Sequence, residues 1–289
     1  MRFIERARAK VNLTLHVPHR RADGWHELES LVVFAGLADR VSLDMDRPLG
    51  LVLDGMRMDE LANVHDNLVM RAAHALNVLV PDLRTGEFTL NKHLPIAAGV
   101  GGGSADAAAA LRLLARANGL SLDDPRLFEA AREIGADVSV CLVSRATIMR
   151  GVGDILGPVL KLPPLYAVLV NPGVPLETKA VFARMGLAPG QARDFGPHPA
   201  IASGISASDL FDQLRHGRND MEDAASVLAP VIGDVLAGIS GARGCRLARM
   251  SGSGATCFGL FSTRHAAQIA ARVIRRDHPK AWAHATFLR

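Results

Sequence analysis

The chain has 289 residues, with 33 Lys and Arg against 29 Asp and Glu and a formal net charge of +4; 49% of its residues are hydrophobic and only 4% aromatic. The length allows one large domain or two of ordinary size. Because rings are scarce, we expect a core built from Ala, Val, Leu and Ile. The basic residues are scattered among acidic ones, which disfavours a nucleic-acid partner and predicts an ordinary solvated surface.

The cysteines indicate a reducing environment. Cys141, Cys245 and Cys257 are odd in number and far apart, which argues against a disulfide framework and a cysteine-based zinc site. The charged N-terminal residues do not lead into an apolar segment, and no apolar run is long enough to span a bilayer. We therefore expect a cytoplasmic protein without a signal peptide or a membrane partner, either a monomer or a weak homodimer.

The first third of the chain is rich in predicted strands. Apolar and polar residues alternate over residues 11–17, which predicts a strand with one buried face, so that Lys10, Asn12, Thr14 and His16 share the other. Asp23-Gly24 predicts a tight turn. A helix is expected over residues 67–80. Further strands are expected at residues 29–34, 39–43, 50–53 and 87–90.

A glycine-rich loop and an alanine-rich helix follow at residues 94–118. Ser104 is a suitable N-cap, Asp106 suits the positive end of the helix, and Gly119 suits the position after its last turn. The next helix is expected to begin near residues 123–125, with a proline in its first turn, and to end at Gly135. Asp137 then lies just beyond a helix.

A boundary between two halves is expected near residues 161–164, where two prolines follow each other. A buried strand at 166–170 comes next. Helices are then expected from about residues 178, 207 and 219, and again over 264–276. Strands are expected at residues 245–250, 256–261 and 282–287, the first two separated by the Ser-Gly break at 251–254.

A glycine-rich loop that opens a helix suits an anion, because its free N–H groups and the helix dipole both favour negative charge. No lysine occurs in residues 99–104, which excludes a Walker A loop. A dinucleotide fingerprint is disfavoured, since Ser104 occupies the last glycine position and residues 95–98 separate the loop from the strand. A purely structural turn is disfavoured to the same degree. A non-Walker phosphate loop remains, and it needs support from other segments of the chain.

The segment from Gly101 to Ala108, after Pro95, resembles the ATP loop of the GHMP kinases, which include galactokinase, homoserine kinase, mevalonate kinase and phosphomevalonate kinase. Residues 9–13 resemble the first motif of that superfamily and residues 251–255 its third. Residues 21–26 and 135–138 are similar to segments of the 4-diphosphocytidyl-2-C-methyl-D-erythritol kinases of non-mevalonate isoprenoid synthesis. The five motifs occur in the family's order over nearly the whole chain.

The resemblance implies an α+β, two-domain GHMP kinase fold. Residues 1–162 would form the nucleotide-binding domain, like domain 2 of ribosomal protein S5, and residues 163–289 a ferredoxin-like α/β domain on the substrate side. The implied reaction is ATP-dependent phosphorylation of the 2-hydroxyl of 4-diphosphocytidyl-2-C-methyl-D-erythritol, with Mg²⁺ accompanying ATP. Asp137 is the implied base and Lys10 its cationic partner. The local pattern alone favours a turn residue at Asp137 and a solvated lysine at Lys10, and only the occurrence of both together with the glycine-rich loop favours the catalytic roles.

For the substrate, the resemblance implies that Asn12 contacts the erythritol end and His26 the cytosine edge. Trp25 stands where the family usually has Tyr and offers a larger face for stacking, although it could instead cap the local core. Phe182, in the segment that starts at Thr178, would place a second ring against the base. The third motif, with Gly252, Ser253 and Gly254, would lie beside the substrate and phosphates, with a plain hairpin turn as the alternative.

For ATP, the resemblance implies that the glycine-rich loop and two residues outside it form the site. Asn67 and Lys92 would line the adenine and ribose pocket, although Asn67 is equally a helix N-cap. Ala105 replaces a second serine of the family, so Ser104 or water would serve Mg²⁺ instead. The implied loop residues are Pro95, Ala97, Ala98, Gly99, Val100, Gly101, Gly102, Gly103, Ser104 and Ala105.

Other functions stay open at this point. Another small-alcohol kinase of the superfamily, such as a mevalonate-type kinase, is disfavoured by the residues at 23–26. A nucleotide-binding module without catalysis is the alternative from a different class, given the change at Ala105. A dehydrogenase would require tight NAD binding, which we do not expect.

Overall fold

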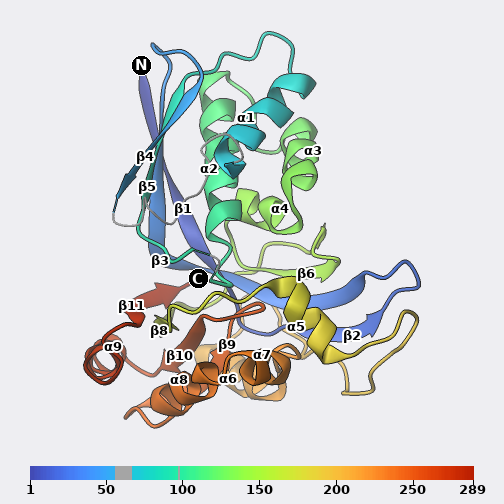
Figure 1. The fold of residues 1–289 in the computed structure, drawn as a ribbon, viewed down its shortest axis with the longest axis vertical. Coiled ribbons are helices and arrows are strands. Elements are labelled where there is room, and N and C mark those ends of the chain that lie inside the picture. The colour runs from blue at the N-terminus through green and yellow to red at the C-terminus, as the bar shows by residue number, and fades with distance from the viewer. Residues whose placement is uncertain (56–66, 97) are drawn as a thin grey trace. The chain divides into compact units, whose positions relative to one another are not determined.

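The computed structural model describes residues 1–55, 67–96 and 98–289 (Figure 1). The chain forms two compact units that interleave along the sequence. Unit 1 consists of Met1–Lys10, Leu37–Ile96 and Gly101–Ser144, and unit 2 of Val11–Gly36, Ala97–Val100 and Arg145–Arg289. The chain thus passes from one unit to the other several times. The predicted domain boundary between residues 162 and 163 stays a prediction.

Unit 1 contains a sheet with helices on one face, as Figure 1 shows. Strand β5 (Glu87–Lys92) pairs antiparallel with the second half of β3 (His26–Asp44) and parallel with β4 (Gly50–Gly55). Strand β1 (Arg2–Asn12) also pairs with β3. The covering helices are α1 (Leu68–Leu79), α2 (Gly102–Ala117), α3 (Pro125–Ile134) and α4 (Ala136–Val143).

Two of these helices begin where the sequence predicts, and two differ from the prediction. Asn67 caps α1 and Asp124 caps α3 through their side chains. The predicted N-cap at Ser104 is wrong, because Gly102 and Gly103 are already helical and Gly101 is the cap residue of α2. Helix α4 was not expected, and Asp137 lies in its first turn rather than in a turn outside a helix.

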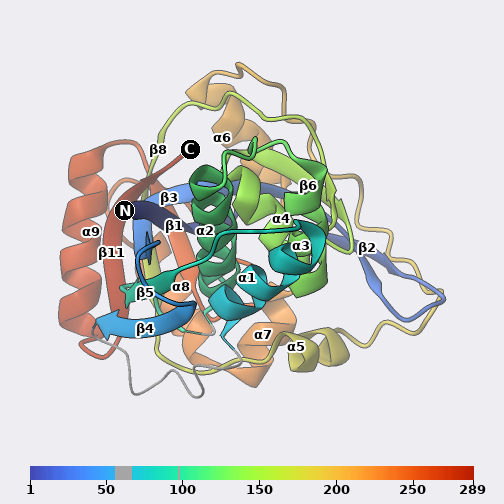
Figure 2. The same cartoon turned by 90° about the horizontal axis from the view of Figure 1, so that it is seen from above.

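Unit 2 is built on an antiparallel sheet in the order β11 (Trp282–Leu288), β8 (Leu165–Asn171), β10 (Cys257–Phe261) and β9 (Cys245–Met250). The first half of β3 pairs with β2 (His16–Arg20) and with β6 (Thr147–Gly151), which pairs in turn with β7 (Ile155–Leu156). Its helices are α5 (Thr178–Met185), α6 (Ala207–His216), α7 (Glu222–Leu228), α8 (Val231–Ser240) and α9 (Arg264–Asp277). Helix α9 runs beside β11 (Figure 2).

The N-terminal strands differ from the predicted pattern. The strand expected over residues 11–17 is interrupted, because β1 ends at Asn12 and β2 begins at His16. All residues from Ala9 to Val17 are buried, so the alternation does not separate a core face from a solvent face. The two strands expected at 29–34 and 39–43 are one long strand, β3, and β6 and β7 were not predicted.

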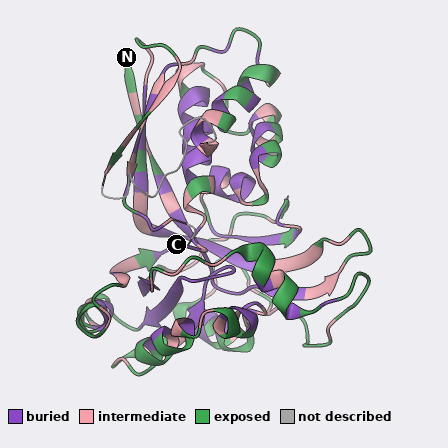
Figure 3. Ribbon diagram, viewed as in Figure 1, coloured by how far each residue is buried: buried purple, intermediate pink, exposed green. Residues whose placement is uncertain are grey.

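Small aliphatic side chains fill the core, as the composition predicts. Helix α2 is buried continuously from Ala105 to Ala115 (Figure 3). In unit 2 the core includes Val168, Val170 and Ile239. Four phenylalanines are the largest wholly buried side chains: Phe34, Phe88, Phe258 and Phe261. Among the described residues, no helix is long and apolar enough to cross a membrane.

Truncation in α2 should test this packing. Leu111 is wholly buried in α2, whereas Leu122 is 52% exposed. We expect Leu111→Ala to lower the free energy of unfolding by about 2–5 kcal/mol, because the close-packed site cannot collapse around the cavity. Leu122→Ala should change it by less than about 0.5 kcal/mol. Urea unfolding measures both, and a loss below about 1 kcal/mol for Leu111→Ala would contradict the packing described.

Candidate active site

No side chain caps the N-terminus of α2, which begins at the end of the glycine-rich loop. Its cap residue, Gly101, has no side chain to accept from the first helical N–H groups, and its φ of 62° lies in the left-handed region. The first N–H groups of a helix have no partners within that helix. With the positive end of the helix dipole, they can hold an anion such as a phosphate group.

Lys10 and Asp137 form an ion pair next to this loop. The distance from Lys10 Nζ to Asp137 Oδ2 is 2.8 Å, and the Lys10 side chain is only 5% exposed while that of Asp137 is 34% exposed. A Cβ at Gly101 would lie 3.2 Å from Lys10 Cε. The absence of a side chain at this position therefore lets the lysine pass directly beneath the loop. The structure brings the two predicted catalytic residues together.

A second buried cation lies under the first turn of α2. The Lys92 ammonium is paired with Asp39 and with Asp106 Oδ2, the latter at 2.8 Å, and all three side chains are buried. Asp39 also accepts from the N–H groups of His93 and Leu94, which fixes the start of the loop. A Cβ at Gly102 would lie 3.6 Å from Lys92 Nζ. The Lys92 ammonium is thus already satisfied, and its predicted nucleotide contact stays a prediction.

Asp106 does not face the helix end as the sequence suggested, but turns inward to Lys92. Burial raises the pKa of Asp106 to about 7; Lys92 opposes this shift and Asp39 adds to it. Its Oδ1 has no hydrogen-bond partner among the described residues. The two aspartates raise the pKa of Lys92 against the opposing effect of burial. The pKa of the Asp106 carboxyl therefore lies near neutrality, although Lys92 is its direct partner.

The first half of the glycine-rich loop lies against the third motif within unit 2. The Ser251 hydroxyl donates to the Gly99 carbonyl at 3.2 Å. A Cβ at Gly99 would come within 2.5 Å of the Gly254 carbonyl, and the φ of Gly99 is +69°. A side chain at Gly99 would therefore force the two loops apart. The third motif thus packs against the glycine-rich loop in addition to connecting two strands.

Other predicted substrate residues also gather around the third motif. The Asn12 N–H donates to Ser251 Oγ at 3.1 Å, and its side-chain amide donates to Ser30 Oγ at 2.7 Å. Its side-chain oxygen is buried without a partner among the described residues. Thr178 Oγ1 lies 2.7 Å from Ser253 Oγ. These contacts join the first and third motifs and the start of α5.

Asn219 also belongs to this group, although no sequence pattern pointed to it. Its side-chain amide donates to the carbonyls of Met250 and Gly252 and thereby holds the first half of the third motif. A single asparagine ahead of a predicted helix gives no local signal of such a contact, since the partners lie about thirty residues further along the chain.

Two of the three rings predicted to bind the base are in contact. His26 and Phe182 stack with centroids 4.2 Å apart and planes 16° from parallel. Trp25 is 64% exposed and does not cap the core. Burial lowers the pKa of His26, and Arg20 and Arg193 lower it further, so its imidazole is neutral near pH 7. Its Nε2 is buried without a partner among the described residues.

Asn67 and most loop residues predicted to bind ATP lie within the described part of the chain. Asn67 Oδ1 accepts from the Val69 N–H at 3.0 Å, which confirms its N-cap role and leaves a nucleotide contact as a prediction. Pro95, Ala98, Val100 and Ala105 are buried, and Ser104 is half-buried in the first turn of α2. Ala97 lies outside the described residues.

The donor set fits a Mg²⁺ ion that arrives with ATP. Within the described ranges, no three His, Cys, Asp or Glu side chains cluster to hold a metal ion. Mg²⁺ commonly binds through nucleotide phosphates and waters with only one or two protein ligands. The Ser104 hydroxyl at the start of α2 is the protein oxygen that suits this role.

The buried carboxyl should give stability a distinctive pH dependence. Between about pH 4 and 7 the folded protein keeps a proton on Asp106 that the unfolded chain releases, so this group lowers the free energy of unfolding as the pH rises. We expect Asp106→Asn to flatten this fall. Between pH 5 and pH 7.5, the free energy of unfolding of Asp106→Asn should rise by more than about 1 kcal/mol relative to that of the wild type.

Urea unfolding at the two pH values measures this effect. Asp123→Asn, which changes an exposed carboxyl, is the control and should follow the wild-type pH dependence. Parallel curves for Asp106→Asn and the wild type would contradict the protonated state assigned to Asp106.

Known proteins match this chain over its whole length. Models of the N-terminal and C-terminal domains of GHMP kinases match residues 67–145 and 201–280. A 4-diphosphocytidyl-2-C-methyl-D-erythritol kinase of Methylobacterium radiotolerans is 56% identical over 286 residues, covering 99% of this chain and 98% of the relative. A crystal structure of 4-(cytidine 5'-diphospho)-2C-methyl-D-erythritol kinase has a TM-score of 0.76 at 33% identity, covering 99% of both chains.

A mevalonate kinase structure from L. major shares the fold alone, with a TM-score of 0.67 and 14% identity over 100% of this chain and 97% of its own. The predicted α+β GHMP kinase fold is thus confirmed, and the comparisons favour the cytidylyl-substrate kinases over the mevalonate-type alternative. The chain belongs to the GHMP kinase superfamily and, within it, to the family of 4-diphosphocytidyl-2-C-methyl-D-erythritol kinases.

Proposed function

We propose that this kinase transfers the γ-phosphoryl group of ATP to the 2-hydroxyl of 4-diphosphocytidyl-2-C-methyl-D-erythritol, giving the 2-phosphate and ADP. The observation that supports this most directly is the ion pair of Lys10 and Asp137 at 2.8 Å, with the lysine stem against Gly101. Phosphoryl transfer to an alcohol needs a proton acceptor, a cation and donors around the phosphate. Unit 1 supplies all three.

Each of these groups has a defined part in the reaction. Asp137 accepts the hydroxyl proton as the oxygen attacks the γ-phosphorus, and Lys10 orients the carboxylate through their ion pair. The open N–H groups at the start of α2 stabilise the charge on the transferring phosphate. Mg²⁺, when bound with ATP, neutralises phosphate charge. Ser104 is the residue proposed to hold it.

We propose that unit 2 recognises the cytosine through Trp25, His26 and Phe182. His26 and Phe182 are already in van der Waals contact, so a base cannot enter between them in this arrangement. The exposed face of Trp25 is the surface on which a base can stack. The neutral His26 imidazole, with its unpartnered Nε2, suits a hydrogen bond to the base edge.

The erythritol end is proposed to contact Asn12, whose unpartnered side-chain oxygen can accept from a hydroxyl group. Asn12 follows Lys10 by two residues on β1. Thr178, Gly252, Ser253 and Gly254 are proposed to complete this region. We place the reaction in the cytoplasm, where the thiols of the three cysteines stay reduced, and propose a monomer or weak homodimer.

The role of Asp137 can be tested by kinetics. We expect Asp137→Asn to lower kcat roughly 10²- to 10⁴-fold, because the amide cannot accept the hydroxyl proton. Asp123→Asn changes an exposed carboxyl and should leave kcat unchanged. ADP release is measured with and without the cytidylyl substrate, with thermal unfolding as a check of folding. Turnover of folded Asp137→Asn within about tenfold of wild type would reject Asp137 as the base.

The same assay separates the function from its alternatives. Substrate-dependent ADP release supports the proposed reaction. Turnover only with other alcohols would indicate another small-alcohol kinase, and ATP binding without any turnover would indicate a non-catalytic module.

Stacking on Trp25 can be tested separately from the chemistry. We expect Trp25→Ala to raise KM for the cytidylyl substrate roughly 5- to 100-fold, since stacking of a base on a ring is worth about 1–3 kcal/mol. Trp25→Phe keeps a ring and should raise the KM for the cytidylyl substrate much less. The KM for ATP should stay constant in both variants. In Trp282→Phe, Trp25 is the only tryptophan left, and substrate should quench its fluorescence. An unchanged substrate KM in Trp25→Ala would contradict stacking.

A further inference from the structure

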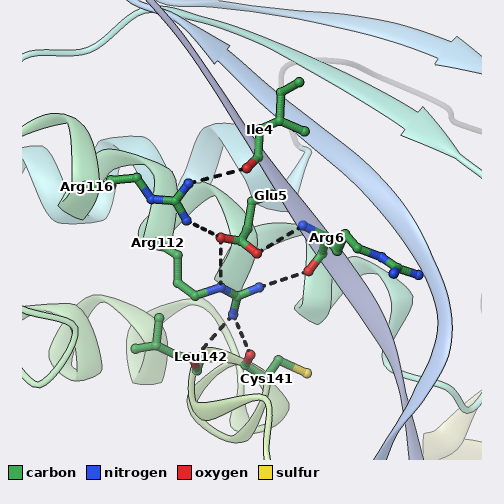
Figure 4. Close-up of polar contacts among 7 residues, drawn as sticks. All are labelled: Ile4, Glu5, Arg6, Arg112, Arg116, Cys141 and Leu142. Atoms are coloured by element: carbon green, nitrogen blue, oxygen red, sulfur yellow. Dashed lines mark hydrogen bonds and ion pairs between the residues drawn. The ribbon is translucent and has the colours of Figure 1, made fainter.

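The side chain of Arg112 connects three elements of unit 1 (Figure 4). Arg112 lies on α2 and is only 7% exposed. One terminal nitrogen donates to the carbonyls of Cys141 and Leu142 on α4, at 2.7 and 3.3 Å. The other donates to the carbonyl of Arg6 on β1 at 3.2 Å. One guanidinium therefore joins the helix that begins at the phosphate loop to two further elements.

The contact with α4 stabilises the end of a short helix. The carbonyls of Cys141 and Leu142 belong to its last turn, where the helix has no N–H groups left to donate to them. A positive charge is also favourable at the negative end of a helix dipole. Helix α4 has only eight residues and no side-chain cap at its N-terminus. Isolated helices of this length are unstable, so its order depends on contacts such as that of Arg112.

The two elements that Arg112 connects are those that carry the ion pair. Cys141 follows Asp137 by four residues, about 6 Å along the helix. Arg6 precedes Lys10 by four residues, about 13 Å along the strand. The guanidinium is a flat fork that can donate in two directions at once. It thus spans the distance from α4 to β1 at a fixed geometry.

We propose that Arg112 is a positioning residue for phosphoryl transfer: it holds α4 against β1 so that the Asp137 carboxylate stays at the Lys10 ammonium. This inference rests on the proposed function of that pair. Arg112 acts through Asp137 and does not itself touch the reacting groups. The 3.9 Å approach of its Nε to Glu5 Oε2 balances part of its charge.

Arg116 provides a matched control on the same helix. It lies one turn after Arg112 and donates to Glu5 Oε2 at 2.6 Å and to the Ile4 carbonyl at 3.4 Å. Its side chain is 49% exposed. Figure 4 shows that both arginines reach β1 and that Arg112 also reaches α4. A comparison of the two separates a general link to β1 from the specific link to α4.

The experiment compares Arg112→Lys, Arg112→Met and Arg116→Met in the full chain. Lysine keeps the charge, but a single ammonium cannot donate to α4 and to β1 at the same time, as the guanidinium does. We expect Arg112→Lys to lower kcat roughly 10- to 100-fold, since a displacement of about 1 Å at a catalytic group can cost this much. KM for ATP and for the cytidylyl substrate should stay within about threefold. Arg116→Met should keep the wild-type kcat.

Hydrogen exchange gives a readout that does not require activity. In Arg112→Lys the amides of α4 should exchange faster than in the wild type while those of α2 stay protected, and in Arg116→Met both should stay protected. If Arg112→Met fails to fold, Arg112→Lys still decides the question. Absence of substrate-dependent ADP release in the wild type would reject the proposed function. Hydrogen exchange of the α4 amides in Arg112→Lys would then still test whether Arg112 holds α4 in place.

Three results would overturn the proposal. The first is a wild-type kcat and wild-type exchange of α4 in Arg112→Lys. The second is a loss of activity that appears as a higher KM for ATP, which would assign Arg112 to the phosphate loop. The third is an equal loss of kcat in Arg116→Met, which would reduce Arg112 to a general structural contact.

Discussion

The ion pair between the buried Lys10 and the partly exposed Asp137 is the interaction on which the rest of the site depends. An ammonium that is only 5% exposed is costly to bury without a partner. The Asp137 carboxylate therefore has to stay within reach of Lys10, which requires α4 to stay ordered against β1. It also requires Gly101, because a side chain there would crowd the lysine stem that passes beneath the loop. One ion pair thus constrains a strand, a short helix and a loop.

Close backbone approach is the second constraint, and it explains the composition. Glycines bring the phosphate loop near Lys10 in unit 1 and against the third motif in unit 2. The alanine-rich α2 is buried over most of its length, which lets neighbouring elements pack closely around it. Aromatic side chains would be too large for most of these positions. Their scarcity leaves Trp25 as an exposed ring in the segment that we propose binds the cytosine.

Much of the site was predictable because its chemistry demands particular residues in local order. The glycine-rich loop and the helix starts at Asn67 and near Asp124 have signals within a few residues of themselves. Lys10 and Asp137 stand out only because their motifs occur together with that loop. The rest depends on contacts between distant segments, which local patterns do not contain. The N-cap preference of Ser104 was overridden by two helical glycines, and α4 was hidden by its short length. The pairing of Lys92 with Asp39 and Asp106, and the two-way link of Arg112, appear only in three dimensions.

The most direct test of the central claim is a crystal structure with a non-hydrolysable ATP analogue and 4-diphosphocytidyl-2-C-methyl-D-erythritol. We expect the substrate's 2-hydroxyl to lie within about 3 Å of the Asp137 carboxylate, as a general base requires. The γ-phosphate should lie at the N–H groups that begin α2, with Lys10 still paired to Asp137. A 2-hydroxyl directed away from Asp137, or phosphates bound elsewhere than at this helix, would contradict the roles proposed for Asp137 and for the start of α2.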